Sequence, residues 1–364
     1  MRGKRFSIAA TGIAGVLAIG AAAAPAAGAA SAAAPSWHFV KKVKTDFSGQ
    51  FSAVIATGTT TGWAFDGDGL TSAPTAWVRK GNTWTKMTAF PGKKNEEVVT
   101  AGASSPSNVW AFLNTMNAGS RALRWNGAKW TVARTFPAEI MDASVLAPND
   151  VWVFGLQGFA HVTTALGVWH YNGRGWLQVS KTYQGGDALS ANDVWAFNGT
   201  NIEHWNGHSW ATTSVKKLLP PVIPGPLNDP VVEDILALSD QNVFAVGNGN
   251  DEDDGGPLVV LHYNGHTWAK VAGGLSGYGP GPEISSDGSG GLWLPITPNA
   301  GGLSYLAHYS KGKLTKAALP VSASDITIVA VYRIPGTTQQ LAGGYTHANL
   351  SPGSNVVAVL LQYS

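Results

Sequence analysis

The sequence predicts an all-β fold, a seven-bladed β-propeller made of four-stranded antiparallel blades, and three observations predict it. Beyond the N-terminal segment there is no sustained 3.6-residue apolar periodicity, and short apolar runs alternate with Gly, Pro, Ser, Thr and Asn, as in strands joined by turns. A two-part motif repeats along the chain. The chain has 45 glycines and no cysteine, so the packing of a core, without disulfides, must stabilise it.

The N-terminal segment, residues 1–32, has the pattern of a secretory signal peptide. Arg2, Lys4 and Arg5 precede an Ala-, Gly- and Ile-rich run that ends in small residues, which is the order of an export signal and its cleavage site. We expect cleavage near residues 29–36. A membrane anchor is the alternative, but the run is only weakly apolar, and no later segment approaches the roughly 18 apolar residues of a membrane helix. The sequence therefore predicts a secreted, extracellular protein without membrane insertion.

The charge of the mature chain argues against nucleic acid as a partner. The leader holds three of the 24 Lys and Arg residues and none of the 22 Asp and Glu residues. The mature chain keeps 21 basic residues against 22 acidic ones, so its net charge is about −1. A nucleic-acid-binding protein usually carries a basic patch to meet the phosphates.

The repeated unit has two halves, each with turn signals. The first half occurs as "SPSNVWAF", "APNDVWVFG", "SANDVWAF" and "SDQNVFAVG", and the second as "LRWNGAKW", "WHYNGRGW", "EHWNGHSW" and "LHYNGHTW". A glycine stands three residues before a tryptophan in five copies: Gly81/Trp84, Gly127/Trp130, Gly173/Trp176, Gly207/Trp210 and Gly265/Trp268. We expect Asn and Gly to supply two residues that tolerate positive φ in a tight hairpin. Each unit then reads as four strands, or one blade.

The number of units and the two chain ends predict how the ring closes. Residues 37–364 form the single predicted domain and divide into seven units of about 47 residues. The last unit stops at Gln362, Tyr363 and Ser364, which align with His262, Tyr263 and Asn264, just before a missing turn and fourth strand. The segment Trp37–Val43 resembles a fourth strand and can complete this blade, which removes the open sheet edges. Six or eight blades are the alternatives if one weak copy is miscounted.

Aromatic and histidine side chains recur at fixed places in the units. Second-strand aromatics (Trp63, Trp110, Trp152, Trp195, Phe244 and Trp293) suit packing between neighbouring sheets, with sugar stacking as the alternative. Histidines precede a third-strand aromatic in four units (His170, His204, His262 and His308). Because each belongs to a different blade, they lie too far apart to share a metal ion at ligand distances of about 2 Å. We therefore interpret them as hydrogen-bonded packing residues.

The variable loops joining the second and third strands, and each blade to the next, should open on one face, where binding residues usually gather. Candidate ligand-binding residues on this face are Asp66, Asp68, Phe159, His161, Asn198, Asn201, Pro221 and Tyr278. The connection Asn198–Asn201 is the shortest of these loops. It predicts a dip in the face, between a loop of residues 158–167 and a proline-rich loop of residues 218–226.

Acidic residues stand at or near the start of the innermost strand in six units: Glu97, Asp142, Asp187, Asp234, Glu283 and Asp325. On one face of a ring these side chains would converge on the mouth of the channel and could bind a cation or a polyhydroxylated ligand. The alternative is that they are solvated strand ends. The direction of the side chains decides between the two.

Other motifs give little support for a metal site or for catalysis. Asn250, Glu252 and Asp254 precede Gly255 as in a calcium loop, but Leu261 stands where an EF-hand would have its closing Glu. A structural Ca²⁺ at this loop is one hypothesis and a solvated acidic loop is the other. The G-x-S-x-G and H-E-x-x-H motifs and a cysteine nucleophile are absent. We therefore expect no enzyme activity and no other cofactor.

The "DVWAF" unit at Asp193 and the "HWNGHSW" unit at His204 resemble the repeats of secreted propeller proteins of filamentous actinobacteria. Within that group they are similar to the propeller-type lectin subunits of umbrella toxin particles, which antagonise competing bacteria. The resemblance implies lectin-like recognition of a cell-surface glycan and docking to a small adaptor protein. The alternative is an extracellular polysaccharide lyase or hydrolase acting in the channel.

Overall fold

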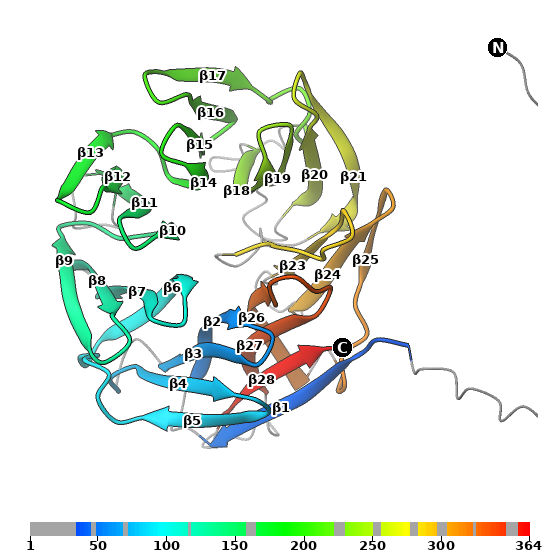
Figure 1. Ribbon diagram of the computed structural model, residues 1–364. Coiled ribbons are helices and arrows are strands. Elements are labelled where there is room, and N and C mark those ends of the chain that lie inside the picture. Colours follow the sequence, from blue (N-terminus) through cyan, green and yellow to red (C-terminus); the bar gives the residue numbers. More distant parts are fainter. Residues whose placement is uncertain are drawn as a thin grey trace, which may run out of the picture. The chain divides into compact units, whose positions relative to one another are not determined.

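Seven four-stranded antiparallel sheets stand around a central axis in the computed structural model (Figure 1). The structure describes residues 34–44, 49–67, 72–115, 118–157, 165–221, 230–249, 256–276, 283–296, 304–322, 325–346 and 356–364. These belong almost wholly to one unit, Pro35–Ser364. The predicted fold, an all-β propeller of seven blades, is confirmed.

The blades follow in chain order, each from its innermost to its outermost strand. Blade 1 comprises β2 (Gln50–Gly58), β3 (Thr61–Gly67), β4 (Thr75–Lys80) and β5 (Thr83–Met87). Blade 2 comprises β6 (Glu96–Ser105), β7 (Asn108–Thr115), β8 (Gly119–Trp125) and β9 (Trp130–Phe136). Blade 3 comprises β10 (Asp142–Ala147), β11 (Asp150–Gln157), β12 (Ala165–Tyr171) and β13 (Trp176–Ser180). Blade 4 comprises β14 (Gly185–Ser190), β15 (Asp193–Asn198), β16 (Asn201–Trp205) and β17 (Trp210–Ser214).

Blade 5 comprises β18 (Val231–Ser239), β19 (Asn242–Asn248), β20 (Pro257–Tyr263) and β21 (Trp268–Ser276). Blade 6 comprises β22 (Ser285–Ser286), β23 (Leu292–Ile296), β24 (Tyr305–Ser310) and β25 (Lys313–Lys316). Blade 7 comprises β26 (Ile326–Arg333), β27 (Gln340–Thr346), β28 (Val357–Tyr363) and, from the other end of the chain, β1 (Trp37–Lys44).

The two ends of the described chain meet in blade 7, as the sequence predicts. Strand β1 pairs antiparallel with β28, from Trp37 opposite Tyr363 to Lys44 opposite Val357. The backbone groups of Ser36 and Ser364 exchange two further hydrogen bonds. Trp37 is 4% exposed and packs edge-on against Trp293 of blade 6, with ring centroids 5.3 Å apart. The closing strand is therefore fixed by side-chain packing as well as by backbone hydrogen bonds.

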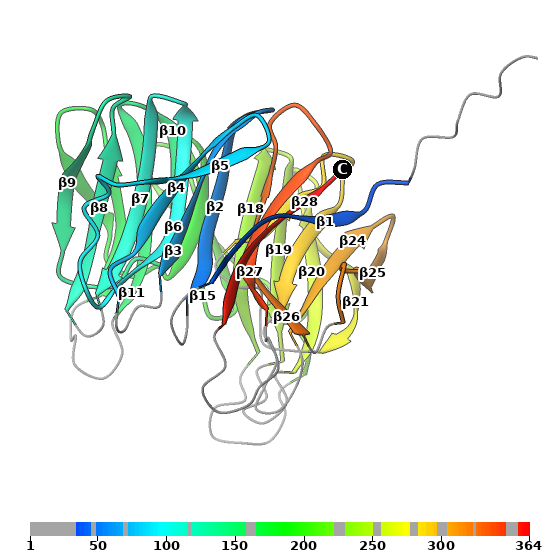
Figure 2. The ribbon, with the colours of Figure 1, turned by 90° about the horizontal axis from the view of Figure 1, so that it is seen from below.

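The alternating strand directions give the ring two different faces, and Figure 2 shows the blades from the side. The short-turn face carries the turns between first and second strands and between third and fourth strands. The loop face carries the connections between second and third strands and between blades. In the described part of the chain, no helix is long and apolar enough to cross a membrane.

The hairpin turns between third and fourth strands differ in one detail from the prediction. Gly207 has a φ of +91°, but asparagine does not share this conformation, because the only non-glycine residues with positive φ in the described ranges are Asn95 and Lys311. Instead, Asn206 Oδ1 accepts hydrogen bonds from the backbone N–H groups of His208 and Ser209, at 3.0 and 2.9 Å. The asparagine closes the turn through its side chain, an Asx-type contact.

In blades 3 and 4 the recurrent tryptophan and histidine share an aspartate, and we call this group the His–Asp–Trp cluster. Asp193 Oδ1 accepts hydrogen bonds from Trp195 Nε1 at 3.1 Å and from His204 Nε2 at 2.8 Å. The indole and imidazole rings stack with centroids 4.0 Å apart. Trp195 is 3% exposed. Both residue types therefore pack the space between blades.

Candidate functional site

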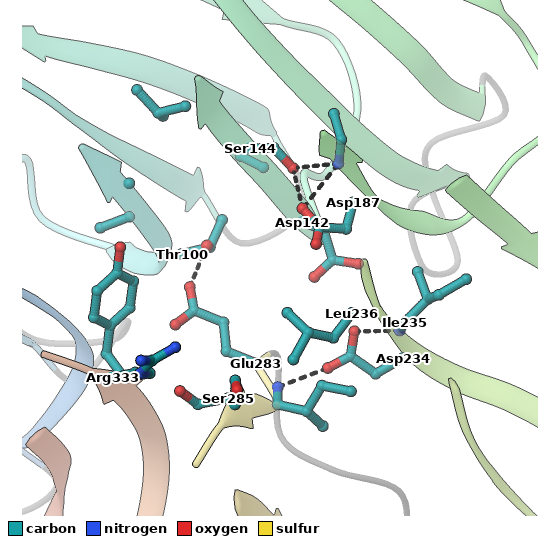
Figure 3. Close-up of a pocket in the computed structure, with 18 of the residues that line it drawn as sticks. Thr100, Asp142, Ser144, Asp187, Asp234, Ile235, Leu236, Glu283, Ser285 and Arg333 are labelled. Carbon is teal, nitrogen blue, oxygen red and sulfur yellow. Dashed lines mark hydrogen bonds between the residues drawn. The ribbon is translucent and has the colours of Figure 1, made fainter. Parts of the chain in front are cut away.

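The innermost strands enclose a cavity of about 330 Å³ in the channel of the propeller (Figure 3). It is lined from β6, β10, β14, β18, β22 and β26, the innermost strands of blades 2 to 7, together with the residues just before β22 and just after β26. An innermost strand has a neighbour on one side only, so its other edge presents backbone N–H groups that need acceptors. Several carboxyl groups of the cavity wall accept hydrogen bonds from these backbone groups.

Three aspartates on the cavity wall each accept a backbone hydrogen bond from the next blade. Asp142 Oδ2 accepts from the Gly186 N–H at 3.0 Å, Asp187 Oδ2 from the Ala237 N–H at 3.0 Å, and Asp234 Oδ2 from the Ile284 N–H at 2.8 Å. Each aspartate thus connects its own innermost strand to the following blade. This arrangement satisfies strand edges and fixes the orientation of the carboxyl groups.

Glu283 makes a different connection, because it spans the channel. It stands just before β22 of blade 6, yet its Oε1 accepts a hydrogen bond from Thr100 Oγ1 of blade 2 at 2.5 Å. Its other oxygen, Oε2, is buried and has no hydrogen-bond partner among the described residues. Asp142 Oδ1 likewise makes no hydrogen bond within the described ranges. The cavity therefore contains two carboxyl oxygens that no donor of the described residues engages.

Burial raises the pKa of all four carboxyl groups, and repulsion between the acids adds to it for Asp142 and Asp234. Loss of hydration, with repulsion from Glu283 and Asp187, raises the pKa of Asp142 to about 8. Loss of hydration also raises the pKa of Glu283 to about 7, although the hydrogen bond from Thr100 opposes this rise. Burial also raises the pKa of Asp187 and, with repulsion from Asp142, that of Asp234 well above its ordinary value. The cluster therefore retains protons near neutral pH.

The structure brings together four of the six acidic residues that the sequence singles out: Asp142, Asp187, Asp234 and Glu283. Glu97 is not among the residues lining the cavity, and it accepts a hydrogen bond from Gln50 Nε2 at 2.8 Å. Asp325 is exposed and precedes β26 without lining the cavity. The predicted ring of six acids is therefore a cluster of four on one arc of the channel.

Several polar residues of the cavity are not identified by the sequence analysis. Thr100 holds Glu283, and Ser144 Oγ donates to Asp187 Oδ1 at 2.7 Å. Ser285, Ser286 and Arg333 also line the wall. Their position on innermost strands is the signal that could have found them, since residues two apart on such a strand face the same side.

The candidate ligand-binding residues of the loop face that the structure describes do not line the channel cavity. Asp66 is buried, and its oxygens accept hydrogen bonds from Thr75 and from Trp77 Nε1, so it holds β3 to β4. Asn198 is exposed and donates to the Thr182 carbonyl, while Asn201 is paired with it across a two-residue turn. Pro221 is exposed. The others lie outside the described residues: Asp68, Phe159, His161 and Tyr278.

The predicted calcium loop, with Asn250, Glu252 and Asp254, also lies outside the described residues. Within the ranges that the structure describes, no group of three or more His, Cys, Asp or Glu side chains is placed to hold a metal ion. The four channel acids are thus near enough to repel one another but are not arranged as a ligand set.

Comparisons with known proteins identify the fold and no more. No family model matches the chain. No curated protein matches it. Among solved structures it is similar to YCF48 bound to D1 peptide, with 12% identity, a TM-score of 0.56, and coverage of 90% of this chain and 96% of that one. The WD40 β-propeller domain of Doa1 matches with 13% identity, a TM-score of 0.56, and coverage of 89% and 96%.

A third solved structure is a lectin. The SapL1 lectin in complex with α-methyl fucoside matches with 13% identity, a TM-score of 0.43, and coverage of 77% of this chain and 98% of that one. At this level of similarity it carries no argument about sugar binding here. The chain is a β-propeller by its own strand order, and its ligand must be inferred from its own residues.

Proposed function

We propose that this chain is a secreted, non-catalytic binding protein of the lectin type, which takes a hydroxyl- or amino-bearing part of a cell-surface glycan into the acid-lined channel. One observation carries the proposal. Glu283 Oε2 is buried without a partner among the described residues, in a cavity of about 330 Å³ that holds three more carboxyl groups. A buried acceptor without a donor is costly unless a ligand supplies one.

The chemistry of the cavity wall suits a sugar. Glu283 Oε2 and Asp142 Oδ1 have no donor among the described residues, so they can accept hydrogen bonds from hydroxyl or ammonium groups of a ligand. A retained proton can be donated in return. Ser285 and Ser286 add hydroxyl groups. The volume is at the lower end of the range for small-molecule sites, about 300 to 1,000 Å³, so one sugar ring is the expected occupant.

A polysaccharide hydrolase in the channel is the competing function. Glycosidases usually pair one carboxyl group of raised pKa, the acid, with one that stays ionised as base or nucleophile. Here burial raises the pKa of Asp142 to about 8 and of Glu283 to about 7, and it raises those of Asp187 and Asp234 as well. No carboxyl group of the cluster is set apart as the ionised partner, which favours binding over catalysis.

Secretion and assembly with a protein partner belong to the same proposal. Their support is the leader-like segment 1–32 and the resemblance of the repeats to those of actinobacterial propeller subunits. Docking to an adaptor protein in an extracellular, antibacterial assembly is the role that this resemblance favours. Affinity purification of the tagged protein from the culture supernatant of its producer tests it. Recovery of a large toxin-bearing partner supports the assembly role, and a protein that is recovered alone contradicts it.

The channel itself is tested by calorimetric titration of the purified protein with D-glucosamine and D-glucose, after a glycan array has been screened for extended ligands. We expect D-glucosamine to bind more tightly, because its ammonium group meets carboxyl groups. Glu283→Gln should weaken binding at least tenfold, or about 1.4 kcal/mol. Asp325→Asn, which changes an exposed acid outside the cavity, is the matched control.

Three results would overturn the proposal. The array and both sugars give no binding, or Glu283→Gln binds as tightly as the unaltered protein, or the protein releases reducing ends from a polysaccharide and Asp142→Asn abolishes that release. The last result would establish the hydrolase instead.

A further inference from the structure

Blade 1 differs from blades 2 to 6, which contain the His–Asp–Trp cluster or a variant of it. In blade 3, Asp150 Oδ1 accepts from Trp152 Nε1 at 3.1 Å and from His170 Nε2 at 2.8 Å, as in blade 4. Blade 6 has the same His-to-Asp contact at 3.0 Å and a stacked indole and imidazole at 4.0 Å. Blades 2 and 5 replace the aspartate with asparagine and keep a contact from arginine or histidine. An acceptor and a nitrogen-bearing side chain thus accompany the aromatic ring in each of these blades, although in blade 6 Trp293 Nε1 itself has no hydrogen-bond partner among the described residues.

Blade 1 retains the tryptophan and lacks both partners. Trp63 lies opposite Val78 in the sheet, as Trp195 lies opposite His204, so Val78 stands at the histidine position. Thr61, two residues before Trp63, stands at the aspartate position, and its Oγ1 accepts a hydrogen bond from Thr57 Oγ1 at 2.9 Å. Two short side chains therefore replace an imidazole and a carboxylate.

The indole nitrogen of Trp63 is left without an acceptor. Trp63 is 3% exposed, and its Nε1 makes no hydrogen bond within the described ranges, whereas the same atom of Trp195 donates to Asp193. This N–H is not among the fully buried polar atoms that lack a partner, and Trp63 lines a cavity from which a ligand can supply the acceptor. Blade 1 therefore presents a polar donor where blades 3 and 4 have a completed contact.

A cavity of about 600 Å³ occupies this place, at the short-turn face between blades 1 and 2. Trp63, Thr61 and Val78 line it from blade 1, and Trp125 lines it from blade 2. The Trp63 and Trp125 rings are 5.3 Å apart, and Trp125 is partly exposed. The cavity is thus a space with an aromatic wall, located where other blades carry their cluster.

The charges around this cavity have one sign. The exposed Lys80 and Lys86 line it, as does the buried Arg79, and none of its lining residues is acidic. Arg79 is held by contacts to the Gly81 carbonyl at 3.0 Å and Gln362 Oε1 at 2.9 Å. The two lysines remain to attract an anion. This is the opposite charge preference from that of the acid-lined channel.

We propose that the blade 1 cavity is a second ligand site, and that it takes an acidic sugar, a saccharide ring that bears a carboxylate. The carboxylate accepts the Trp63 Nε1 hydrogen bond, as the Asp193 carboxylate does for Trp195. The ring lies beside Trp63 at the place where His204 stacks on Trp195. Lys80 and Lys86 provide the positive charge, and the ligand thereby supplies both groups that blade 1 lacks.

The experiment compares D-glucuronate with D-glucose, which have the same ring and differ in the carboxylate, by saturation-transfer NMR and by calorimetric titration. We expect D-glucuronate to bind and D-glucose to bind at least tenfold more weakly. The double variant Thr61→Asp with Val78→His rebuilds the cluster of blades 3 and 4 and should abolish binding. Its fold is checked by circular dichroism and thermal unfolding.

Two further variants test binding at the blade 1 cavity if the double variant does not fold. Trp63→Phe removes the N–H group, and Phe244 of blade 5 shows that a phenyl ring is accepted at this position. Lys80→Ala with Lys86→Ala removes the charges, and Lys270→Ala on blade 5 is its control for an exposed lysine. Each blade 1 variant should weaken D-glucuronate binding at least fivefold, while Lys270→Ala should leave it unchanged.

The proposal is overturned if D-glucuronate does not bind the unaltered protein, or if it binds the rebuilt or lysine-free variants equally well. Glu283→Gln in the channel should leave D-glucuronate binding unchanged. If Glu283→Gln instead abolishes D-glucuronate binding, the acidic sugar binds in the channel. The experiment therefore tests the two proposed sites separately.

Discussion

Asp142→Asn should make the propeller more stable at pH 8 while changing its stability little at pH 4. Asp142 has an ordinary pKa of 3.8, which burial and repulsion from neighbouring acids raise to about 8 in the folded protein. Between these pH values the unfolded chain releases a proton that the folded protein keeps. The free energy of unfolding therefore falls as the pH rises through this range and is highest below pH 4, as far as this group is concerned.

The magnitude follows from the same shift. One pKa unit corresponds to about 1.4 kcal/mol, so the rise from 3.8 to about 8 means that ionising Asp142 in the folded protein costs about 6 kcal/mol at most. Redistribution of protons among Asp187, Asp234 and Glu283 reduces the cost that one substitution removes. We expect D142N to raise the free energy of unfolding by about 2 to 5 kcal/mol at pH 8. Its amide oxygen can still accept the Gly186 N–H, which preserves the contact between blades 3 and 4.

Urea unfolding followed by tryptophan fluorescence, at pH values from 4 to 8, measures this difference. The two proteins should have nearly equal stability at pH 4 and diverge steadily above it. Asp325→Asn, at an exposed acid outside the cavity, should show no such divergence. A constant difference between the two proteins across the pH range, or a less stable D142N at pH 8, would refute the electrostatic reasoning.

Two further substitutions and one truncation probe the scaffold, each by thermal or denaturant unfolding. Gly207→Ala should cost about 1 to 2 kcal/mol, because φ is +91° there and a Cβ would meet Asn192 Oδ1 at 2.6 Å; an unchanged midpoint would contradict this. Arg121→Met should lower the free energy of unfolding by about 3 to 5 kcal/mol, because it leaves Glu96 buried without its ion-pair partner. A decrease below about 1 kcal/mol would show that Glu96 finds another donor. Removal of residues 34–44 should cost at least about 3 kcal/mol and promote association, because Trp37 is lost from the core and the β28 edge is uncovered; a monomer of unchanged stability would count against closure by β1.

The architecture could be predicted from the sequence because it depends on local, repeated signals. The Asn-Gly turns, the alternating strands and the truncated last unit each reflect short-range preferences, and together they fix the number of blades and the pairing of β1 with β28. The conformation of the turn asparagine could not be predicted in this way. Its side chain and its backbone both offer ways to close a turn, and the choice between them depends on the exact loop length.

The candidate sites were less predictable, because they depend on contacts between blades. Position near a strand start identified Asp142, Asp187, Asp234 and Glu283, but the same signal also included Glu97 and Asp325, which lie off the cavity. The contact of Glu283 with Thr100 links residues 183 positions apart, so no local pattern indicates it. In blade 1 the sequence shows the repeat only weakly, because Thr61 and Val78 stand where blade 4 has an aspartate and a histidine. Only the structure shows that a cavity lies there.

The pairing of Trp37 with Tyr363 means that the ring is closed by hydrogen bonds between strands from the two ends of the described chain. The strand made first has no partner until the strand made last is in place, so the final hydrogen-bonded ladder must wait for nearly the whole chain. Until then β1 and β28 are unpaired edges, open to another copy. A chain that lacks β1 or β28 cannot complete blade 7. Truncated chains should therefore not form the closed ring.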